Sequence, residues 1–159
     1  MFDVFNPIKR IAEIRERLHK NHASSRQLTE QTNAVGLVGE FRFGEEFGVY
    51  PDTSVRPSGD NGIDFIMPLT FSIDVKTRNY HPKWEPFYLL IEEGTINADI
   101  YVLALIHPDG DKCKLAGWIW GEDACRYPVD DLGTGVRNHQ VPVADLRPMD
   151  ELKNRRVKF

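Results

Sequence analysis

The segment GDNGIDFIMPLTFSIDVKTRN, residues 59–79, constrains the fold more than any other part of the sequence. It holds two short apolar runs, Ile63–Met67 and Phe71–Thr77, which are joined by a Pro-Leu-Thr turn. Runs of this length that are separated by three residues are typical of a β-hairpin. The runs also carry Asp and Lys, which are among the residue types that cost most to bury. These charged residues are Asp64, Asp74 and Lys76.

The alternation of side chains along a strand determines the register that this hairpin should adopt. Alternate residues of a strand face opposite sides of the sheet. The apolar residues of both runs share one face if Met67 pairs with Phe71, so that residues 68–70 form the loop. This register places Phe65 opposite Ile73. The hairpin is thus predicted to be apolar on one face and polar on the other.

The same register brings the three charged side chains together on the polar face. Asp64 lies opposite Asp74, and Lys76 follows at the next position on that face. Two carboxylates directly opposite each other repel, so a structural sheet gains nothing from them, whereas a divalent cation would turn the repulsion into ligation. Mg²⁺ is typically held by one or two carboxylates with phosphate and water. The structural alternative is an exposed ion pair between Asp74 and Lys76, with Asp64 capping a turn after Gly62.

Two helices are predicted before the hairpin. The spacing of apolar residues predicts an amphipathic helix at about residues 6–20 and a second helix at about residues 26–47, which ends at Gly48. Glycines lower helix propensity, so glycines inside a helix suggest close approach to another backbone. The second helix contains Gly36, Gly39 and Gly44.

Several further strands are predicted after it. Residues 98–108, ADIYVLALIHP, form a near-continuous apolar run that predicts a buried central strand, and residues 114–120 predict its partner. Trp118 and Trp120 should share a face and pack in the core. The remaining predictions are a short strand at 49–50, a strand or a helix at 87–98, a short helix or turn at 121–128, and an extended segment with a turn of helix at 141–152.

The charge of the chain is unevenly distributed. The net charge is −4, but residues 1–26 carry six basic and three acidic residues, and residues 151–159 carry four and one. Each terminus is therefore +3, which leaves −10 for the middle of the chain. This distribution argues against a protein that coats nucleic acid by bulk attraction, whereas an acidic middle suits metal binding and basic termini suit phosphates.

The length and composition indicate one ordinary domain. The chain has 159 residues, of which 41% are apolar and 28% are charged. No apolar run reaches membrane-spanning length, and the start of the chain lacks the pattern of a signal peptide. Cys113 and Cys125 lack metal-ligand spacing and are typical of free thiols in a reducing compartment. We therefore expect a cytoplasmic protein with no membrane contact.

The charged residues of the hairpin resemble a family motif. Asp64, followed ten residues later by Asp74-Val75-Lys76 on the next strand, is similar to the motif of the PD-(D/E)XK nuclease superfamily, which has the restriction-endonuclease-like fold. The segment GLVGEFRFGEEFG at 36–48 adds to the resemblance, because many members carry a Gly-Glu pair on the helix before the first strand. Glu40 matches that position best, with Glu45 and Glu46 as alternatives. The resemblance spans roughly residues 27–147, although no proline precedes Asp64.

The resemblance implies an α/β fold with a restriction-endonuclease-like core. Its central mixed β-sheet would be flanked by helices, in the order αβββαβ, with an extra helix at the N-terminus. The chain would then be a single domain composed of an N-terminal helical extension (1–26), a nuclease-like core (27–147) and a basic C-terminal tail (148–159).

The resemblance also implies roles for individual residues. Asp64, Asp74 and Glu40 would bind Mg²⁺, for which Mn²⁺ can substitute, and Lys76 would act on the nucleophilic water; these four would be the catalytic residues. Candidates for contact with nucleic acid are Thr77, Arg78, His81 and Lys83, although the loop that holds the last two is equally well read as a solvated turn.

The expected function is that of a Mg²⁺-dependent deoxyribonuclease, in particular an endonuclease of prokaryotic or phage origin. RNA stays open as a substrate, and a homodimer would suit a double-strand cut by so small a chain. The alternative is a catalytically silent module of the same fold that binds nucleic acid or assembles with a partner. A hydrolase of small phosphate esters is disfavoured, because the sequence has no glycine loop of the kind that cradles phosphate.

Overall fold

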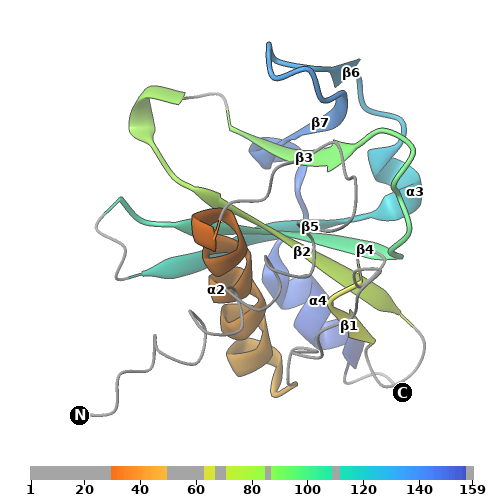
Figure 1. Ribbon diagram of the computed structural model, residues 1–159. Coiled ribbons are helices and arrows are strands. Elements are labelled where there is room, and N and C mark those ends of the chain that lie inside the picture. The colour runs from red at the N-terminus through yellow and green to blue at the C-terminus, as the bar shows by residue number, and fades with distance from the viewer. Residues whose placement is uncertain (1–29, 50–62, 67–70, 85–86, 109–111, 157–159) are drawn as a thin grey trace.

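Two β-sheets and the helices packed beside them make up the described part of the chain (Figure 1). The structure is a computed structural model that describes residues 30–49, 63–66, 71–84, 87–108 and 112–156. The helices are α2 (Glu30–Phe47), α3 (Gly121–Ala124) and α4 (Met149–Arg156), with 3₁₀ turns η1 (Pro82–Trp84) and η2 (Val143–Asp145). The strands are β1 (Phe65–Ile66), β2 (Ser72–Asn79), β3 (Tyr88–Glu92), β4 (Ile100–Ile106), β5 (Cys113–Trp120), β6 (Val129–Asp130) and β7 (Asn138–Pro142). Within these ranges, no helix has both the length and the apolar character that a membrane crossing requires.

The main sheet is mixed and has the strand order β1-β2-β4-β5. β1 is antiparallel to β2, β2 is parallel to β4, and β4 is antiparallel to β5. Phe65 pairs with Ile73, so the predicted register of the hairpin is confirmed. Parallel neighbours need a crossover connection. Here the crossover from β2 to β4 passes through β3, which belongs to a second, antiparallel sheet of order β3-β7-β6.

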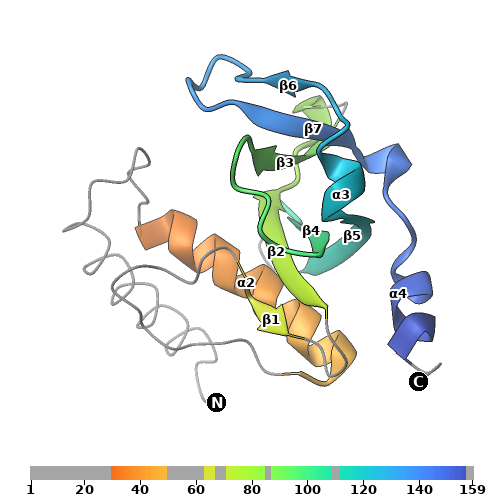
Figure 2. The ribbon, with the colours of Figure 1, turned by 90° about the vertical axis from the view of Figure 1, so that its right-hand side faces the viewer.

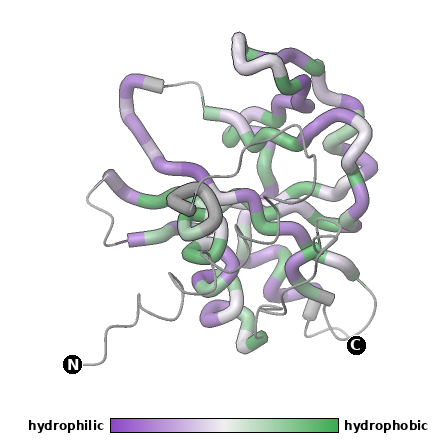
Figure 3. Tube along the Cα trace, in the orientation of Figure 1, coloured by the Kyte–Doolittle hydropathy of each residue, from purple (hydrophilic) through white to green (hydrophobic). Residues whose placement is uncertain are grey.

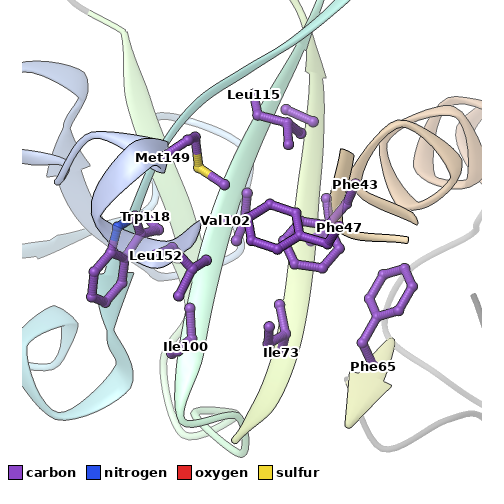
Figure 4. Close-up of a cluster of buried hydrophobic side chains, with 12 residues drawn as sticks. Phe43, Phe47, Phe65, Ile73, Ile100, Val102, Leu115, Trp118, Met149 and Leu152 are labelled. Atoms are coloured by element: carbon purple, nitrogen blue, oxygen red, sulfur yellow. The ribbon is translucent and has the colours of Figure 1, made fainter. Parts of the chain in front are cut away.

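The central strand β4 is apolar along its whole length because both of its faces are covered. Ile100, Val102 and Ala104 face one core, to which α2 and α4 contribute (Figure 4). Tyr101 and Leu103 face a second core, to which β3, β7 and α3 contribute. Figures 1 and 2 show the same layers: the second sheet lies above the main sheet, and α2 and α4 lie below it.

Helix α2 approaches the sheet most closely at Gly39. A Cβ atom on Gly39 would collide with the hydroxyl of Thr77 and lie 2.9 Å from the Cβ of Ala104. The Thr77 hydroxyl donates a hydrogen bond of 3.2 Å to the carbonyl of Gly36. A Cβ on Gly36 itself would meet nothing within 4 Å. The close approach that the helical glycines suggest is therefore confirmed for Gly39 and not for Gly36.

A glycine also ends this helix. Gly48 has a φ of +64°, and the N–H of Val49 donates a hydrogen bond of 3.0 Å to the carbonyl of Gly44. This is the Schellman arrangement, in which a residue with positive φ lets the chain turn back on the last helical carbonyls. The predicted end of the helix is confirmed.

The structure departs from the expected αβββαβ order. Among the described residues, α2 and α4 cover one face of the main sheet, and the small second sheet covers the other face together with the short helix α3. The physical reason is that β3 and β7 each present apolar residues on alternate positions, so that Leu89, Ile91 and Val141 join Leu103 in one core cluster. The open choice at 87–98 is thus resolved as the strand β3.

The C-terminal boundary also differs from the expected one. Residues 149–156, which the sequence places in a basic tail, form α4, and Met149 and Leu152 are buried in the lower core. Trp118 is fully buried there and lies 5.2 Å from the ring of Trp120, as predicted for core packing. Val49 lies outside any strand. The predicted N-terminal helix at 6–20 falls outside the described residues.

Candidate functional site

Asp74 is buried on the upper face of β2. Strand alternation directs Ile73 and Val75 into the lower core, and it directs Asp74 to the opposite face, beside Tyr101 of β4. Asp74 is only 4% exposed. The expectation that the charged face lies outside the core is therefore wrong, because the second sheet covers part of this face and builds a second core on it.

Lys76 forms an ion pair with Asp74. Its Nζ lies 2.6 Å from Oδ2 of Asp74, and its side chain is 38% exposed. Burial acts to lower the pKa of Lys76, but the charge of Asp74 and its hydrogen bond, together with the charge of Asp64, outweigh it and raise the pKa above its ordinary value. Lys76 is therefore a cation at neutral pH, which suits it to stabilise negative charge and not to accept a proton.

Asp64 lies beside this pair, just before β1 and at the end of the hairpin away from its turn. Its N–H donates to the carbonyl of Ile73 at 2.8 Å, and its Oδ2 accepts a hydrogen bond from the N–H of Val75 at 2.6 Å. In an antiparallel ladder that N–H would bond to a backbone carbonyl of the partner strand, so the carboxylate takes the place of a strand neighbour. The pairing shown covers Phe65 and Ile66, and the Asp64 N–H shares Ile73 with Phe65, so the predicted pairing of Asp64 with Asp74 stays a prediction. The charge of Asp64 is close enough to raise the pKa of Lys76.

Tyr101 is a member of this cluster that the sequence reasoning missed. The Nζ of Lys76 lies 5.9 Å from the centre of the Tyr101 ring, within the range of a cation–π contact. The Tyr101 hydroxyl accepts hydrogen bonds from the N–H groups of Asn97 and Ala98. Burial raises the pKa of Tyr101. The sequence indicated Tyr101 only as a polar hydroxyl in an otherwise apolar strand. That Tyr101 lies beside Asp74 depends on the register between β2 and β4, which the sequence does not reveal.

Glu40 is buried in α2, with 6% of its surface exposed. The helix packs on the lower face of the sheet, where Thr77 and Ala104 meet Gly39. Among the described residues, no three His, Cys, Asp or Glu side chains are grouped so that they could hold a metal ion. The structure therefore brings together Asp64, Asp74 and Lys76 but does not complete a group of three carboxylates with Glu40.

The chemistry of the two aspartates fits a divalent cation. Carboxylate oxygens are the ligands that Mg²⁺ and Mn²⁺ prefer, and one or two of them suffice when water and phosphate complete the coordination. Oδ2 of Asp74 contacts Nζ of Lys76, and Oδ2 of Asp64 accepts from the N–H of Val75, so both carboxylates lie in the one cluster. Asp64 and Asp74 are therefore the residues of this cluster that would hold a metal ion.

The four candidates for nucleic-acid contact divide into two pairs. Thr77 and Arg78 have structural contacts: Thr77 bonds to α2, and Nη1 of Arg78 donates to the carbonyl of Tyr88 at 2.8 Å while its guanidinium lies 5.1 Å from the ring centre of Phe87. His81 and Lys83 lie in the connection after β2. Lys83 is exposed, and its N–H donates to Nδ1 of His81 at 3.2 Å.

No protein-family model, curated protein or solved structure matches the chain.

Proposed function

We propose that this protein is a metal-dependent nuclease that hydrolyses phosphodiester bonds of DNA at the cluster of Asp64, Asp74 and Lys76. The observation that carries the proposal is a buried carboxylate, Asp74, with a second carboxylate and a lysine beside it in one hairpin. Perturbed titratable groups gathered in this way are a common feature of active sites. The resemblance of Asp64 and Asp74-Val75-Lys76 to the PD-(D/E)XK motif supports the same reading.

Each side chain would have a distinct role. Asp64 and Asp74 would hold Mg²⁺, which when bound supplies an activated water and neutralises charge on the phosphate. Lys76, kept protonated, would stabilise the negative charge that develops on the scissile phosphate, and a partly buried setting strengthens such an interaction. Asp74 and the Tyr101 ring would hold the ammonium group in place. Glu40 would contribute only if α2 or its side chain moves, since it is not grouped with the two aspartates.

The experiment is a cleavage assay on plasmid, single-stranded, flap and four-way-junction DNA, with a single-stranded RNA as a further substrate. Each is incubated with Mg²⁺, with Mn²⁺ or with EDTA. We expect cleavage of at least one DNA substrate that depends on the metal and is lost in Asp74→Asn. The proposal fails if no substrate is cut, or if Asp74→Asn cuts as fast as the wild type.

A second function, a catalytically silent module that binds nucleic acid, is favoured by a specific observation. Asp74 already has Lys76 as a partner and Asp64 already has the N–H of Val75, so both carboxylates are used in a closed arrangement. Calorimetric titration with Mn²⁺ separates the two functions. Absence of Mn²⁺ binding, together with DNA binding that persists in EDTA, would favour the silent module.

A further inference from the structure

A large cavity lies at the end of the main sheet that is remote from Asp74. Its volume is about 790 Å³, within the range of pockets that hold small organic ligands. It lies where the parallel strands β2 and β4 end and where β5 begins, and ligands of open α/β sheets bind beyond the carboxyl ends of parallel strands. The lining residues are Arg42, Tyr80, Leu105, His107, Lys112, Cys113 and Lys114.

The strand pairing explains why these residues meet. Leu105 of β4 pairs with Lys114 of β5, so their side chains share the upper face. Two positions further out, the N–H of His107 donates to the carbonyl of Lys112 at 2.8 Å. Tyr80 follows β2, and its N–H donates to the carbonyl of Ile106, also at 2.8 Å. The chain just after β4 and just before β5 is hydrophilic, and both strands are hydrophobic toward the middle of the sheet (Figure 3).

The cavity is basic, although the middle of the chain is acidic. Lys112 and Lys114 are exposed, and no carboxylate of the described residues lies within ion-pair distance of either. Arg42 differs from them because Glu46 neutralises it at 3.1 Å and its Nε donates to the carbonyl of Cys113. Asp109 and Asp111, the carboxylates nearest to the lysines in sequence, lie outside the described residues. Among the described residues that line the cavity, the two lysines are therefore the cations without a carboxylate partner.

The wall of the cavity is apolar and partly aromatic. Leu105 is half-buried, and the Tyr80 ring packs against Phe87 with 5.4 Å between ring centres. Cys113 is half-buried, and burial raises the pKa of its thiol, so it stays neutral. A planar apolar group can lie against such a wall, and base–aromatic stacking contributes about 1–3 kcal/mol per base.

From cationic lysines beside an aromatic and apolar wall, we infer that this cavity binds a nucleoside phosphate. The phosphate contacts Lys112 and Lys114, and the base packs against Tyr80 and Leu105. The ligand is either a free nucleotide or one nucleotide of a strand, and the chemistry of recognition is the same in both cases. Tyr80 is six residues from Asp74 along an extended strand, or about 20 Å at about 3.3 Å per residue, so the two sites are separate. The inference goes beyond the proposed function and holds whether or not Asp74 is catalytic.

The test measures binding of two probes in EDTA, so that no cleavage occurs. Calorimetry with dAMP reports a free nucleotide, and fluorescence anisotropy with a labelled 12-nucleotide strand reports a nucleotide within DNA. We expect dAMP, the strand or both to bind about tenfold or more weakly to the double variant Lys112→Ala/Lys114→Ala. If the strand is the ligand, the slope of log affinity against log salt falls by about 0.7, the value for one neutralised phosphate on a single strand. Arg126→Ala/Arg137→Ala removes two exposed cations elsewhere and should leave both affinities unchanged.

A chemical readout locates the ligand independently of charge. The sequence has two cysteines, so in the variant Cys125→Ser an alkylating reagent that is specific for thiols reacts with Cys113. Saturating dAMP or strand should slow alkylation of Cys113.

The inference is overturned if neither probe binds, if binding persists in the lysine variant, or if Cys113 is alkylated equally fast with and without ligand. Inorganic phosphate that competes as well as dAMP would also overturn it, because the base would then contribute nothing. The binding assays run in EDTA without cleavage, so they can fail while the proposed catalysis holds, and loss of cleavage in Asp74→Asn would leave this inference standing.

Discussion

Two lysine–carboxylate ion pairs in this protein are nearly identical in local geometry and different in what they connect. Lys76 lies 2.6 Å from Asp74, and Lys153 lies 2.5 Å from Glu46. The two lysine side chains are 38% and 40% exposed, and the two carboxylates are 5% and 17% exposed. Lys153 and Glu46 join α4 to α2, whereas Asp74 and Lys76 are two residues apart on one strand.

This difference indicates which of the two ion pairs contributes to the packing of the fold. A bridge between two helices helps to fix how they pack, so Glu46 and Lys153 have a structural reason to be there, and Arg42 strengthens it. A pair within one strand holds together what the backbone already holds, yet it requires a carboxylate to be almost fully buried. Burying a charge costs free energy that a single ion pair seldom recovers. The ion pair with Lys76 therefore does little to explain why Asp74 is buried, and a costly buried charge is a pattern expected of a functional residue.

The largest expected effect is that of Asp74→Asn on cleavage. The amide keeps the size of the side chain but removes the negative charge that would hold the metal, so we expect cleavage to fall below detection in the assay with Mg²⁺. Glu46→Gln is the matched control, because it makes the same chemical change in the other pair, and it should cut DNA at the wild-type rate. Equal losses in both variants would mean that the two pairs are alike and that both act through the fold.

The next effect is that of Asp64, which tests whether its structural and functional roles separate. Asp64→Asn keeps an oxygen that can accept from the N–H of Val75, so its free energy of unfolding should fall by less than about 1 kcal/mol, while cleavage is lost. Asp64→Ala leaves that N–H without its acceptor and should cost about 1–3 kcal/mol. Urea unfolding measures both variants. Full cleavage by Asp64→Asn would show that Asp64 only closes the hairpin.

Lys76→Met should reduce the cleavage rate by about 10²–10³, a loss comparable to that of one preorganised donor at a developing charge. It also leaves Asp74 without its cation, and because Lys76 is partly exposed we expect a loss of about 1–3 kcal/mol of folding free energy. Lys153→Met, the control, should cost less than about 1 kcal/mol and leave the rate unchanged. Single-turnover rates and urea unfolding give the two quantities. If the cleavage rate falls in proportion to the lost free energy of unfolding in both Lys76→Met and Lys153→Met, the result would contradict a catalytic role for Lys76.

The smallest effect is the pH dependence of stability. The pKa of Lys76 is raised in the folded protein, so its contribution to stability is fully present below the unfolded pKa, about 10.4, and is lost as pH rises through the folded value. The difference in unfolding free energy between wild type and Lys76→Met should therefore be constant from pH 7 to 9 and shrink above about pH 10.4. A difference that grows with pH would contradict the raised pKa.

The parts of the fold that are local in sequence could be predicted. The hairpin register follows from the alternation of apolar residues within 63–77, and the end of α2 follows from one glycine. The second sheet could not be predicted, because β3 pairs with β7 about fifty residues later and β6 is only two residues long. Nothing in residues 129–142 alone indicates which strand they will meet.

The part of the candidate site that lies within the hairpin could also be predicted, and the part that depends on distant strands could not. The hairpin register brings Asp64, Asp74 and Lys76 together, since that register is local. The burial of Asp74 and the contact with Tyr101 depend on the parallel pairing of β2 with β4 and on the cover from the second sheet. The position of Glu40 relative to the aspartates depends on how α2 lies on the sheet, which Gly39 and Thr77 determine through close packing that helical spacing does not reveal.

The crossover through β3 has a consequence for the order of assembly. The β1–β2 hairpin closes over fewer than ten residues, whereas β2 meets β4 across 27 residues and β3 meets β7 across about fifty. Short loops close early in folding, and pairings distant in sequence form late. We therefore expect Asp64 and the Asp74–Lys76 pair to come together early, in contact with water, and the second sheet to bury Asp74 later. In that order the lysine is in place before the carboxylate is buried, so the charge of Asp74 is not desolvated alone.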